Sequence, residues 1–504
     1  MMEVFNDMLL GFTVALTPVN LFWCFAGVFL GTIVGILPGL GTPATIAILL
    51  PLTFQMSPAT GLIMMAGIYY GSKYGGSTTS ILMNLPGETA SVVTCLDGYQ
   101  MARAGRAGPA LGIAAIASFI AGTVGILGLM FVAPPLANFA LRFGPPEYFS
   151  LMMLGLTMVT FLAGHSMLKG LIAALVGLWL AGVGTDTFTS DPRFTFGRME
   201  LLDGIDFIIV SIGIFAVGEV LVNMEQTLKR DLFHVPKELR NLLPSLGDIK
   251  ACRFAFVNGS IIGFFIGIIP GAGASIASFL SYGIEKAVSR HPEKFGTGAV
   301  EGVAAPEGAN NSETGGALVP LLTLGIPGSN STAMLLAALT LWGMKPGPLL
   351  IPEHPEIFWG LVASMYIGNV FLVILNLPLI PLFAQLLRVP YYVLYPIILG
   401  ISFIGVYVIN NSIFDLWMLA FFGLLGYALR KLDFPAAPLI LALVLGIRAE
   451  ESFRQSLTMS QGSLLIFVDR ELSLIMLLLA GALLLMPLIR GARRWRTRAV
   501  SDED

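Results

Sequence analysis

The stretch GVFLGTIVGILPGLG (residues 27–41) sets the organisation predicted for the whole chain. It returns as GSIIGFFIGIIPGAG at residues 259–273, where every glycine and the proline stay in register at an offset of 232 positions. Glycines spaced four apart in an apolar run predict a membrane helix whose backbone neighbours can approach closely. The Pro-Gly-x-Gly segment then interrupts the helix, because proline removes a backbone hydrogen bond and glycine permits other conformations. The sequence therefore predicts two interrupted membrane helices related by an internal repeat.

The composition places the chain in a membrane. Apolar residues make up 56% of it, charged residues only 12%, and the mean hydropathy is +0.82, whereas a soluble domain carries about 25% charged residues. The first 72 residues contain no Lys or Arg, and Leu472–Ile489 is an uncharged run close to the minimum for a spanning helix. We predict an all-α polytopic integral membrane protein with discontinuous or re-entrant helices and about 10–14 membrane segments. The lipid bilayer is its expected surroundings.

Other protein classes find no support in the residue pattern. The three cysteines are far apart without a CxxC pair, and the four histidines show no ligand spacing, so no transition metal is expected. PGAGAS lacks the Gly-Lys-Ser/Thr of a phosphate-binding loop, and neither HExxH nor GxSxG occurs. We therefore expect no enzyme, no catalytic residues, no cofactor and no nucleic-acid partner.

The match between the halves extends beyond the opening motif. Ser72, Gly75 and Gly76 correspond to Ser312, Gly315 and Gly316 at an offset of 240, and Pro86-Gly87 corresponds to Pro327-Gly328 at an offset of 241. We predict membrane repeats at residues 1–228 and 255–489. A basic linker at 229–254 separates them, and a tail follows at 490–504.

Charge placement predicts how the two repeats are inserted. The linker and the tail are rich in Lys and Arg, so both are expected in the cytoplasm. Where one repeat is basic, the other is nearly neutral at the matching position: Lys286, Arg290 and Lys294 have no cationic counterpart at residues 53–61. Two copies inserted in opposite directions would give this pattern. We therefore predict inverted-topology repeats with a periplasmic N-terminus and a cytoplasmic C-terminus.

Four polar stretches fall at apparent membrane depth: the two glycine breaks, GGSTTSILMNLPGE (75–88) and NNSETGGALVPLLTLGIPGSNS (310–331). Irregular backbone there is tolerated only when it is buried in protein or lines a cavity. Free N–H groups of half-helices suit an anion, and carbonyl and side-chain oxygens suit a desolvated sodium ion. The alternative is that these small residues only let helices cross.

The candidate residues form two sets. The substrate-binding candidates are Ser77, Thr78, Thr79, Asn84, Pro86, Gly87, Asn310, Asn311, Gly315, Gly316, Pro327, Gly328 and Ser329. The candidates for ion binding or coupling are Gly39, Gly41, Thr42, Gly271, Gly273, Ser275, Glu88 and Glu307, with sodium as the possible metal.

The charged residues within the apolar regions leave alternatives open. Lys73 and Glu313 match at an offset of 240 with opposite sign, so they form a pair or one of them touches substrate. Glu88 and Glu307 take part in cation or proton coupling, or they cap helices. A channel or a non-transporting scaffold is the alternative for the whole protein, although paired inverted breaks favour alternating access.

Several motifs together resemble the large membrane subunit of the tripartite tricarboxylate transporter family. They are GTIVGILPGLG, YYGSKYGGSTTSILMNLPGETASVV, LDGYQMARAGRAGPALGIAAI, GIIPGAGASIASFLSYG, EGVAAPEGANNSETGGALVPLLTLGIPGS and GYALRKLDFPAAPLILALVLG. The resemblance implies a secondary transporter of the bacterial inner membrane that takes up citrate or another small carboxylate. It also implies a small four-helix membrane subunit, a periplasmic substrate-binding protein, a sodium gradient as the driving force, and no ATPase.

Overall fold

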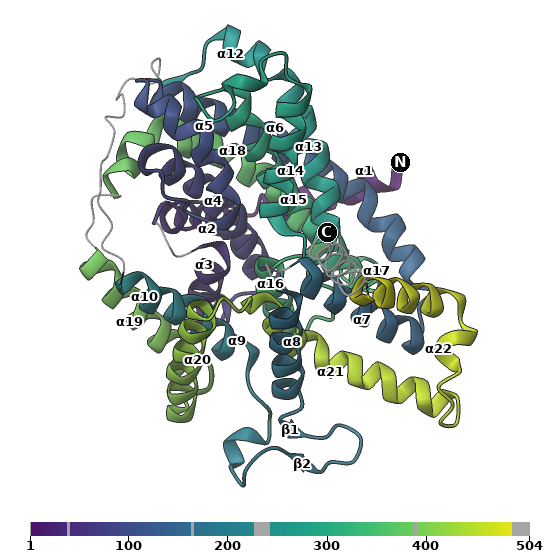
Figure 1. Ribbon diagram of the computed structural model, residues 1–504. Coiled ribbons are helices and arrows are strands. Elements are labelled where there is room, and N and C mark those ends of the chain that lie inside the picture. Colours follow the sequence, from purple (N-terminus) through teal and green to yellow (C-terminus); the bar gives the residue numbers. More distant parts are fainter. Residues whose placement is uncertain (1, 38–40, 163–165, 226–241, 387–390, 486–504) are drawn as a thin grey trace, which may run out of the picture. The chain divides into compact units, whose positions relative to one another are not determined.

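The computed structural model is 80% helical, which confirms the predicted all-α class (Figure 1). It describes residues 2–37, 41–162, 166–225, 242–386 and 391–485. Within these ranges, Pro18–Ile36, Ala107–Ala140, Phe207–Met224, Pro355–Leu379 and Ile413–Lys431 are helices long and apolar enough to cross a membrane. Shorter apolar helices accompany them. The predicted residue Gly39, residues 229–241 of the predicted linker (229–254) and the whole tail lie outside the described residues.

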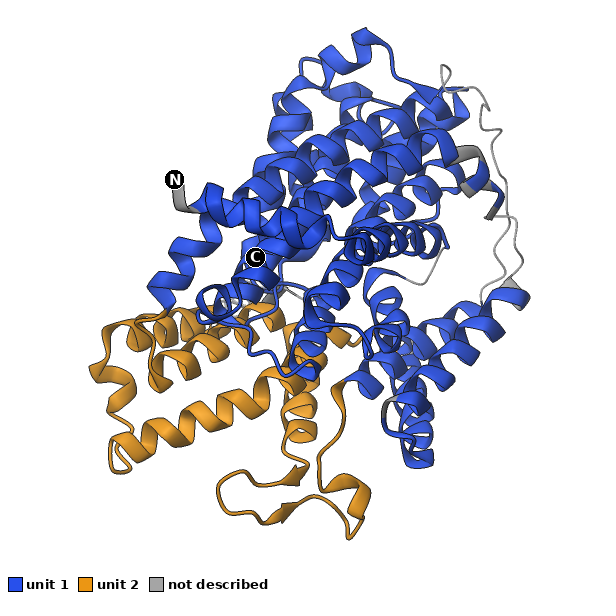
Figure 2. Ribbon diagram, turned by 180° about the vertical axis from the view of Figure 1, so that it is seen from behind, with its two compact units in different colours: residues 1–140, 208–431 blue, residues 141–207, 432–504 orange. Residues whose placement is uncertain are grey.

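The described ranges divide into two compact units, each formed by two separate segments of the chain (Figure 2). Unit 1 comprises Met1–Ala140 and Ile208–Lys431, and unit 2 comprises Leu141–Phe207 and Leu432–Asp504. The helices of unit 1 that matter below are α2 (Pro18–Ile36), α3 (Gly41–Leu49), α4 (Pro58–Met83), η2 (Thr89–Ser91), α5 (Val92–Arg103), α6 (Ala107–Ala140), α13 (Arg253–Ile268), α14 (Gly273–Val288), α15 (Glu301–Leu324), α16 (Asn330–Leu341), α18 (Pro355–Leu386) and α20 (Ile413–Lys431).

Two helix pairs in unit 1 pack through the glycines of the repeated motif. On α2, a Cβ added at Gly35 would lie 2.6 Å from Ser72 Cα of α4; on α13, one added at Gly267 would lie 2.6 Å from Glu313 O of α15. Real Cβ atoms essentially never come this close to other heavy atoms, so only glycine permits these crossings.

The glycine contacts also refine the register between the two helix pairs. The offset is 232 on the first helix of each pair (267 − 35) and 241 on the second (313 − 72). Ser72 therefore corresponds in space to Glu313, and Lys73 corresponds to Thr314. The helix contacts thus give an offset of 241 here, one residue more than the sequence offset of 240 that matches Lys73 with Glu313.

The polar stretches are helical along most of their length, contrary to the expectation of irregular backbone. Residues 75–83 belong to α4 and residues 310–324 to α15, and the chain breaks only at Asn84 (φ 57°) and Gly325 (φ 71°). The hydroxyls stay compatible with a helix because they donate to carbonyls one turn back, as Ser77 Oγ does to Lys73 O (3.2 Å) and Thr323 Oγ1 to Val319 O (2.7 Å).

Unit 2 contains α7 (Pro145–Leu162), α8 (Met167–Ala181), α21 (Ala436–Met459) and the two-residue strands β1 (Gly184–Thr185) and β2 (Pro192–Arg193). Asp186 follows β1 and accepts hydrogen bonds from the backbone N–H groups of Thr189 and Phe188 at 2.9 and 2.8 Å. These bonds, with Arg454 beside the carboxylate, lower the pKa of Asp186 to about 2. The loop is thereby tied to α21.

Candidate functional site

A connected set of polar side chains lies between α3, α4, η2, α5 and α15 in unit 1. We call it the buried polar cluster: Thr42, Tyr69, Ser72, Lys73, Ser77, Glu88, Thr94, Glu307, Asn310, Asn311 and Glu313. All of these residues except Glu88, which is partly exposed, are buried. The cluster joins the polar stretches of both halves of the sequence.

Glu88 connects both halves of the sequence within the cluster. Its Oε2 accepts a hydrogen bond from Thr42 Oγ1 at 2.8 Å, and its Oε1 accepts one from Asn310 Nδ2 at 2.5 Å. Ser72 Oγ in turn donates to Thr42 Oγ1 at 2.9 Å. Glu88 is also the N-cap residue of η2, where its backbone N–H donates to Ser91 Oγ at 3.3 Å.

Glu307 is buried among hydroxyl groups. Its carboxylate accepts hydrogen bonds from Ser77 Oγ of α4 and Thr94 Oγ1 of α5. One turn further along α15, Asn311 Nδ2 donates to Glu307 O at 3.1 Å and to Ser118 Oγ of α6 at 2.7 Å. Glu307 therefore links α15 to both α4 and α5 without a cationic side chain among these hydrogen bonds.

Lys73 and Glu313 form a buried ion pair in the middle of the cluster. Lys73 Nζ lies 2.5 Å from Glu313 Oε2 and 2.7 Å from Asn310 O. Tyr69, one turn before Lys73 on α4, donates from its hydroxyl to the same Glu313 Oε2 at 3.1 Å. The Tyr69 hydroxyl also lies 3.5 Å from Ser329 Oγ, which caps α16. Of the two alternatives that the sequence left open for Lys73 and Glu313, the structure shows the ion pair.

Several buried oxygens of α15 and α16 have no hydrogen-bond partner among the described residues. They are Asn310 Oδ1, Glu313 Oε1, Thr314 Oγ1 and Asn330 Oδ1. The first three lie on α15 at positions i, i+3 and i+4, and therefore share one face of that helix. Buried polar groups are nearly always satisfied in proteins. Such a group of acceptors without donors is suited to a cation.

The two chain breaks also meet. The N–H of Gly271 donates to Gly328 O at 2.9 Å, so the break after α13 rests on the break after α15. Ser275 Oγ of α14 donates to Thr89 Oγ1, next to Glu88, at 2.9 Å. These contacts bring three of the predicted positions (Gly271, Ser275 and Gly328) close to the cluster.

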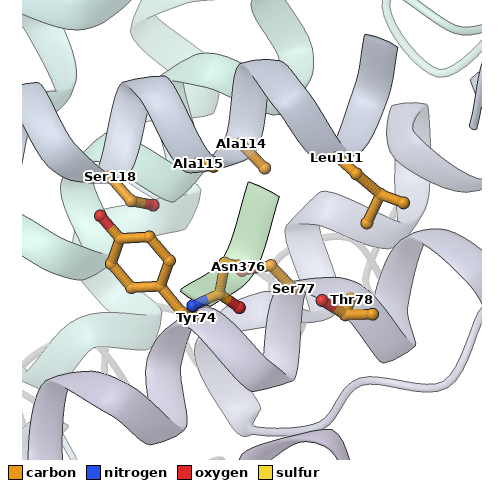
Figure 3. Close-up of a pocket in the computed structure, with 8 residues that line it drawn as sticks. All are labelled: Tyr74, Ser77, Thr78, Leu111, Ala114, Ala115, Ser118 and Asn376. Carbon is orange, nitrogen blue, oxygen red and sulfur yellow. The ribbon is translucent and has the colours of Figure 1, made fainter. Parts of the chain in front are cut away.

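A small pocket opens beside the cluster (Figure 3). It lies between α4, α6 and α18 and is lined by Tyr74, Ser77, Thr78, Leu111, Ala114, Ala115, Ser118 and Asn376. The cavity volume open to water is about 10 Å³, which is room for about one water molecule. The pocket is therefore too small for a ligand much larger than a water molecule.

The structure brings together Ser77, Asn310, Asn311, Thr42, Glu88 and Glu307 among the residues predicted from sequence. Thr78 lines the pocket, whereas Thr79 donates to Ile36 O at 2.6 Å and serves helix packing. Gly315 and Gly316 meet the backbones of α6 and α13, as the packing alternative predicts. Asn84 is exposed at the end of α4.

Sequence reasoning missed Tyr69, Thr94 and Thr314. Tyr69 lies one turn from Lys73 on the same helix, and this spacing was the available signal. Thr94 comes from α5, and nothing local to its sequence indicates a contact with a glutamate 213 residues away. Among the described residues, no three His, Cys, Asp or Glu side chains lie close enough together to bind one metal ion.

Many apolar helices around a buried polar cluster built from both halves of the chain are the features of a multi-pass membrane transport protein. The chain belongs to the tripartite tricarboxylate transporter TctA family, whose sequence profile matches residues 21–441. It is thus a component of a tripartite tricarboxylate transporter that works with other subunits, and it is not an enzyme.

Similar proteins occur in Agrobacterium vitis. The chain is 48% identical, over the full length of both proteins, to an "Uncharacterized 52.8 kDa protein in TAR-I ttuC' 3'region". It is 42% identical over 242 residues, which is 48% of this chain and all of the relative, to an "Uncharacterized protein in TAR-II ttuC' 3'region". No solved structure matches the chain.

Proposed function

We propose that this protein is the large subunit of a sodium-gradient-driven uptake system for a tricarboxylate or another small carboxylate in the bacterial inner membrane. A periplasmic binding protein delivers the substrate, and a small four-helix membrane subunit completes the complex. Two inverted repeats alternate access to the site, with the N-terminus in the periplasm and the C-terminus in the cytoplasm. Membership of the family supports the transport role.

The charge balance of the buried polar cluster carries the proposal of cation coupling. The cluster contains three carboxylates, from Glu88, Glu307 and Glu313, and one cationic group, from Lys73. Buried charge is costly unless it is compensated. The arrival of an anionic substrate adds further negative charge. A transporter built this way must take up cations with its substrate, and an inward sodium gradient then drives accumulation.

The proposed ion and substrate sites use different chemistry. Side-chain oxygens of Thr42, Glu88, Ser275 and Glu307, with backbone groups at Gly41, Gly271 and Gly273, are proposed to hold or couple the ion. Ser77, Asn310, Asn311 and Ser329, with the chain breaks at Pro86-Gly87 and Pro327-Gly328, are proposed to hold the substrate. Backbone N–H groups at such breaks favour an anion.

Reconstitution tests the proposed function directly. The chain is placed in proteoliposomes with its small membrane subunit and its binding protein, loaded with labelled citrate as the first probe. We expect accumulation against the citrate gradient under an inward sodium gradient and none under an equal potassium gradient. Downhill flux without accumulation would identify a channel instead, and no flux with any loaded binding protein would leave a scaffold.

Replacing the two adjacent asparagines tests whether they act in transport and not only in folding. Asn310→Ala and Asn311→Ala are each expected to abolish sodium-dependent uptake. The reason is that Asn310 binds Glu88 across the cluster and Asn311 binds Ser118 beside the pocket. Quantifying the protein in the membrane supplies the control, and it should equal that of the unmodified chain. Normal uptake by both variants would rule out the proposed site.

A further inference from the structure

We propose that Lys73 binds a carboxylate of the substrate, and that a sodium ion releases Lys73 for this role by taking its place on Glu313. The inference rests on the proposed function and assigns a charge exchange to its site. In the structure, Lys73 and Glu313 neutralise each other.

The burial of this pair sets it apart from the other ion pairs. Lys73 is 2% exposed and Glu313 is 1% exposed, whereas ten other ion pairs among the described residues each have a partner at least 31% exposed. Desolvation of two charges roughly cancels their attraction, and apolar residues of the same volume often give equal or greater stability. Stability alone therefore does not explain a lysine and a glutamate at this depth.

Of the two carboxylate oxygens of Glu313, Oε2 accepts hydrogen bonds and Oε1 does not. Lys73 and Tyr69 both bind Oε2, while Oε1 has no partner. Asn310 Oδ1 and Thr314 Oγ1, on the same face of α15, also lack partners. One acceptor is enough for a proton, but a carboxylate with several neutral oxygens is the ligand type that a hard metal cation prefers. These atoms favour a sodium ion at Glu313, a position separate from the ion set proposed above around Glu88 and Glu307.

The exchange follows from charge balance. When sodium neutralises Glu313, Lys73 becomes a buried ammonium group that needs another anion. A substrate carboxylate supplies it and also replaces the hydrogen bond that Lys73 gave to Glu313. The two ligands then raise each other's affinity by the same factor, as linkage requires. Neither ligand alone leaves the site neutral.

Three variants test the exchange in the reconstituted citrate assay. In the unmodified protein, the apparent KM for citrate should fall about tenfold or more from low to saturating sodium. Glu313→Gln frees Lys73 permanently, so the KM should change less than about twofold over the same range. Lys73→Met/Glu313→Met removes both charges and leaves no unpaired buried ion, so it should fold but transport no citrate.

A binding measurement without substrate tests the sodium half of the proposal. Relative to potassium, sodium should raise the thermal transition of purified Lys73→Met, in which Glu313 has lost its cationic partner but keeps the hydrogen bond from Tyr69. It should raise the transition of the Lys73→Met/Glu313→Met variant measurably less. Equal sodium effects on these two proteins would overturn the assignment of sodium to Glu313.

Other outcomes decide the remaining points. Citrate uptake at the normal rate by Lys73→Met/Glu313→Met would show that the pair is structural and overturn the proposal. The matched control is Glu219→Gln/Arg430→Gln, an ion pair between α20 and α10 (Gly218–Met224) with Arg430 48% exposed. It should keep the normal sodium dependence. Failure of the unmodified protein to accumulate any carboxylate with sodium would instead refute the proposed function.

Discussion

Gly35→Val and Gly267→Val are each expected to reduce the folded protein in the membrane to less than about a tenth of normal. In both variants the new Cβ would lie 2.6 Å or less from the backbone of the facing helix, α4 or α15. Neither helix can move away without pulling apart the buried polar cluster, because both helices contribute residues to it. Overpacking of this kind costs about 1–3 kcal/mol, and more where the backbone must shift, as it must at both of these glycines. Each 1.4 kcal/mol lowers the ratio of folded to unfolded protein about tenfold.

The matched control is a glycine within the same unit. A Cβ at Gly283 on α14 would meet no atom within 4 Å, so Gly283→Val adds the same side chain without a clash. Size-exclusion chromatography of the detergent-extracted proteins measures the folded fraction. If Gly35→Val and Gly283→Val gave equal folded yields, the close approach of α2 and α4 would not matter for folding.

The glycine spacing shows what the sequence could predict about the fold. Small residues four apart form a local pattern, so closely packed membrane helices could be predicted from it, while the all-α class was predicted from the apolar composition. The pattern does not say which helix fills the groove, and the pairs α2 with α4 and α13 with α15 emerge only in the structure. The continuity of α4 and α15 was missed because Gly, Ser and Thr disfavour helices in water. In a buried setting their hydroxyls bond to the preceding turn.

The part of the candidate site that lies in or next to the repeated polar stretches could be predicted from the sequence. Asn310 stands in a repeated polar stretch, with Glu307 three residues before it, and the structure joins both to residues of the other half. Lys73 and Glu313 were recognisable as opposite charges in apolar surroundings. Their exact register and their partner Tyr69 depend on how α4 crosses α15, which no local pattern encodes.

Asp97 is a buried residue with many hydrogen bonds that the sequence analysis did not single out. It lies on α5 and is fully buried, and its Oδ1 accepts hydrogen bonds from the backbone N–H groups of Gly296, Gly298 and Ala299 at 2.9, 2.8 and 2.8 Å. Its Oδ2 accepts one from the Tyr282 hydroxyl at 2.9 Å. Asp97 therefore fixes the loop that leads into α15.

Asp97→Ala is expected to lower the free energy of unfolding by about 3 kcal/mol or more. Three backbone N–H groups would lose their acceptor, and each unsatisfied buried group costs about 1–3 kcal/mol. Tyr282→Phe is the matched control: it removes the single bond to Oδ2 and should cost only about 1 kcal/mol. Thermal unfolding in detergent compares the two proteins.

Because the loop held by Asp97 leads into the helix that carries Glu307, Asn310 and Glu313, its loss should also reach the site. Asp97→Ala should therefore lose sodium-driven uptake at temperatures where the protein is still folded, while Tyr282→Phe keeps it. Equal unfolding temperatures for the two variants would show that the loop is held by other contacts. The start of α15 would then not depend on this carboxylate.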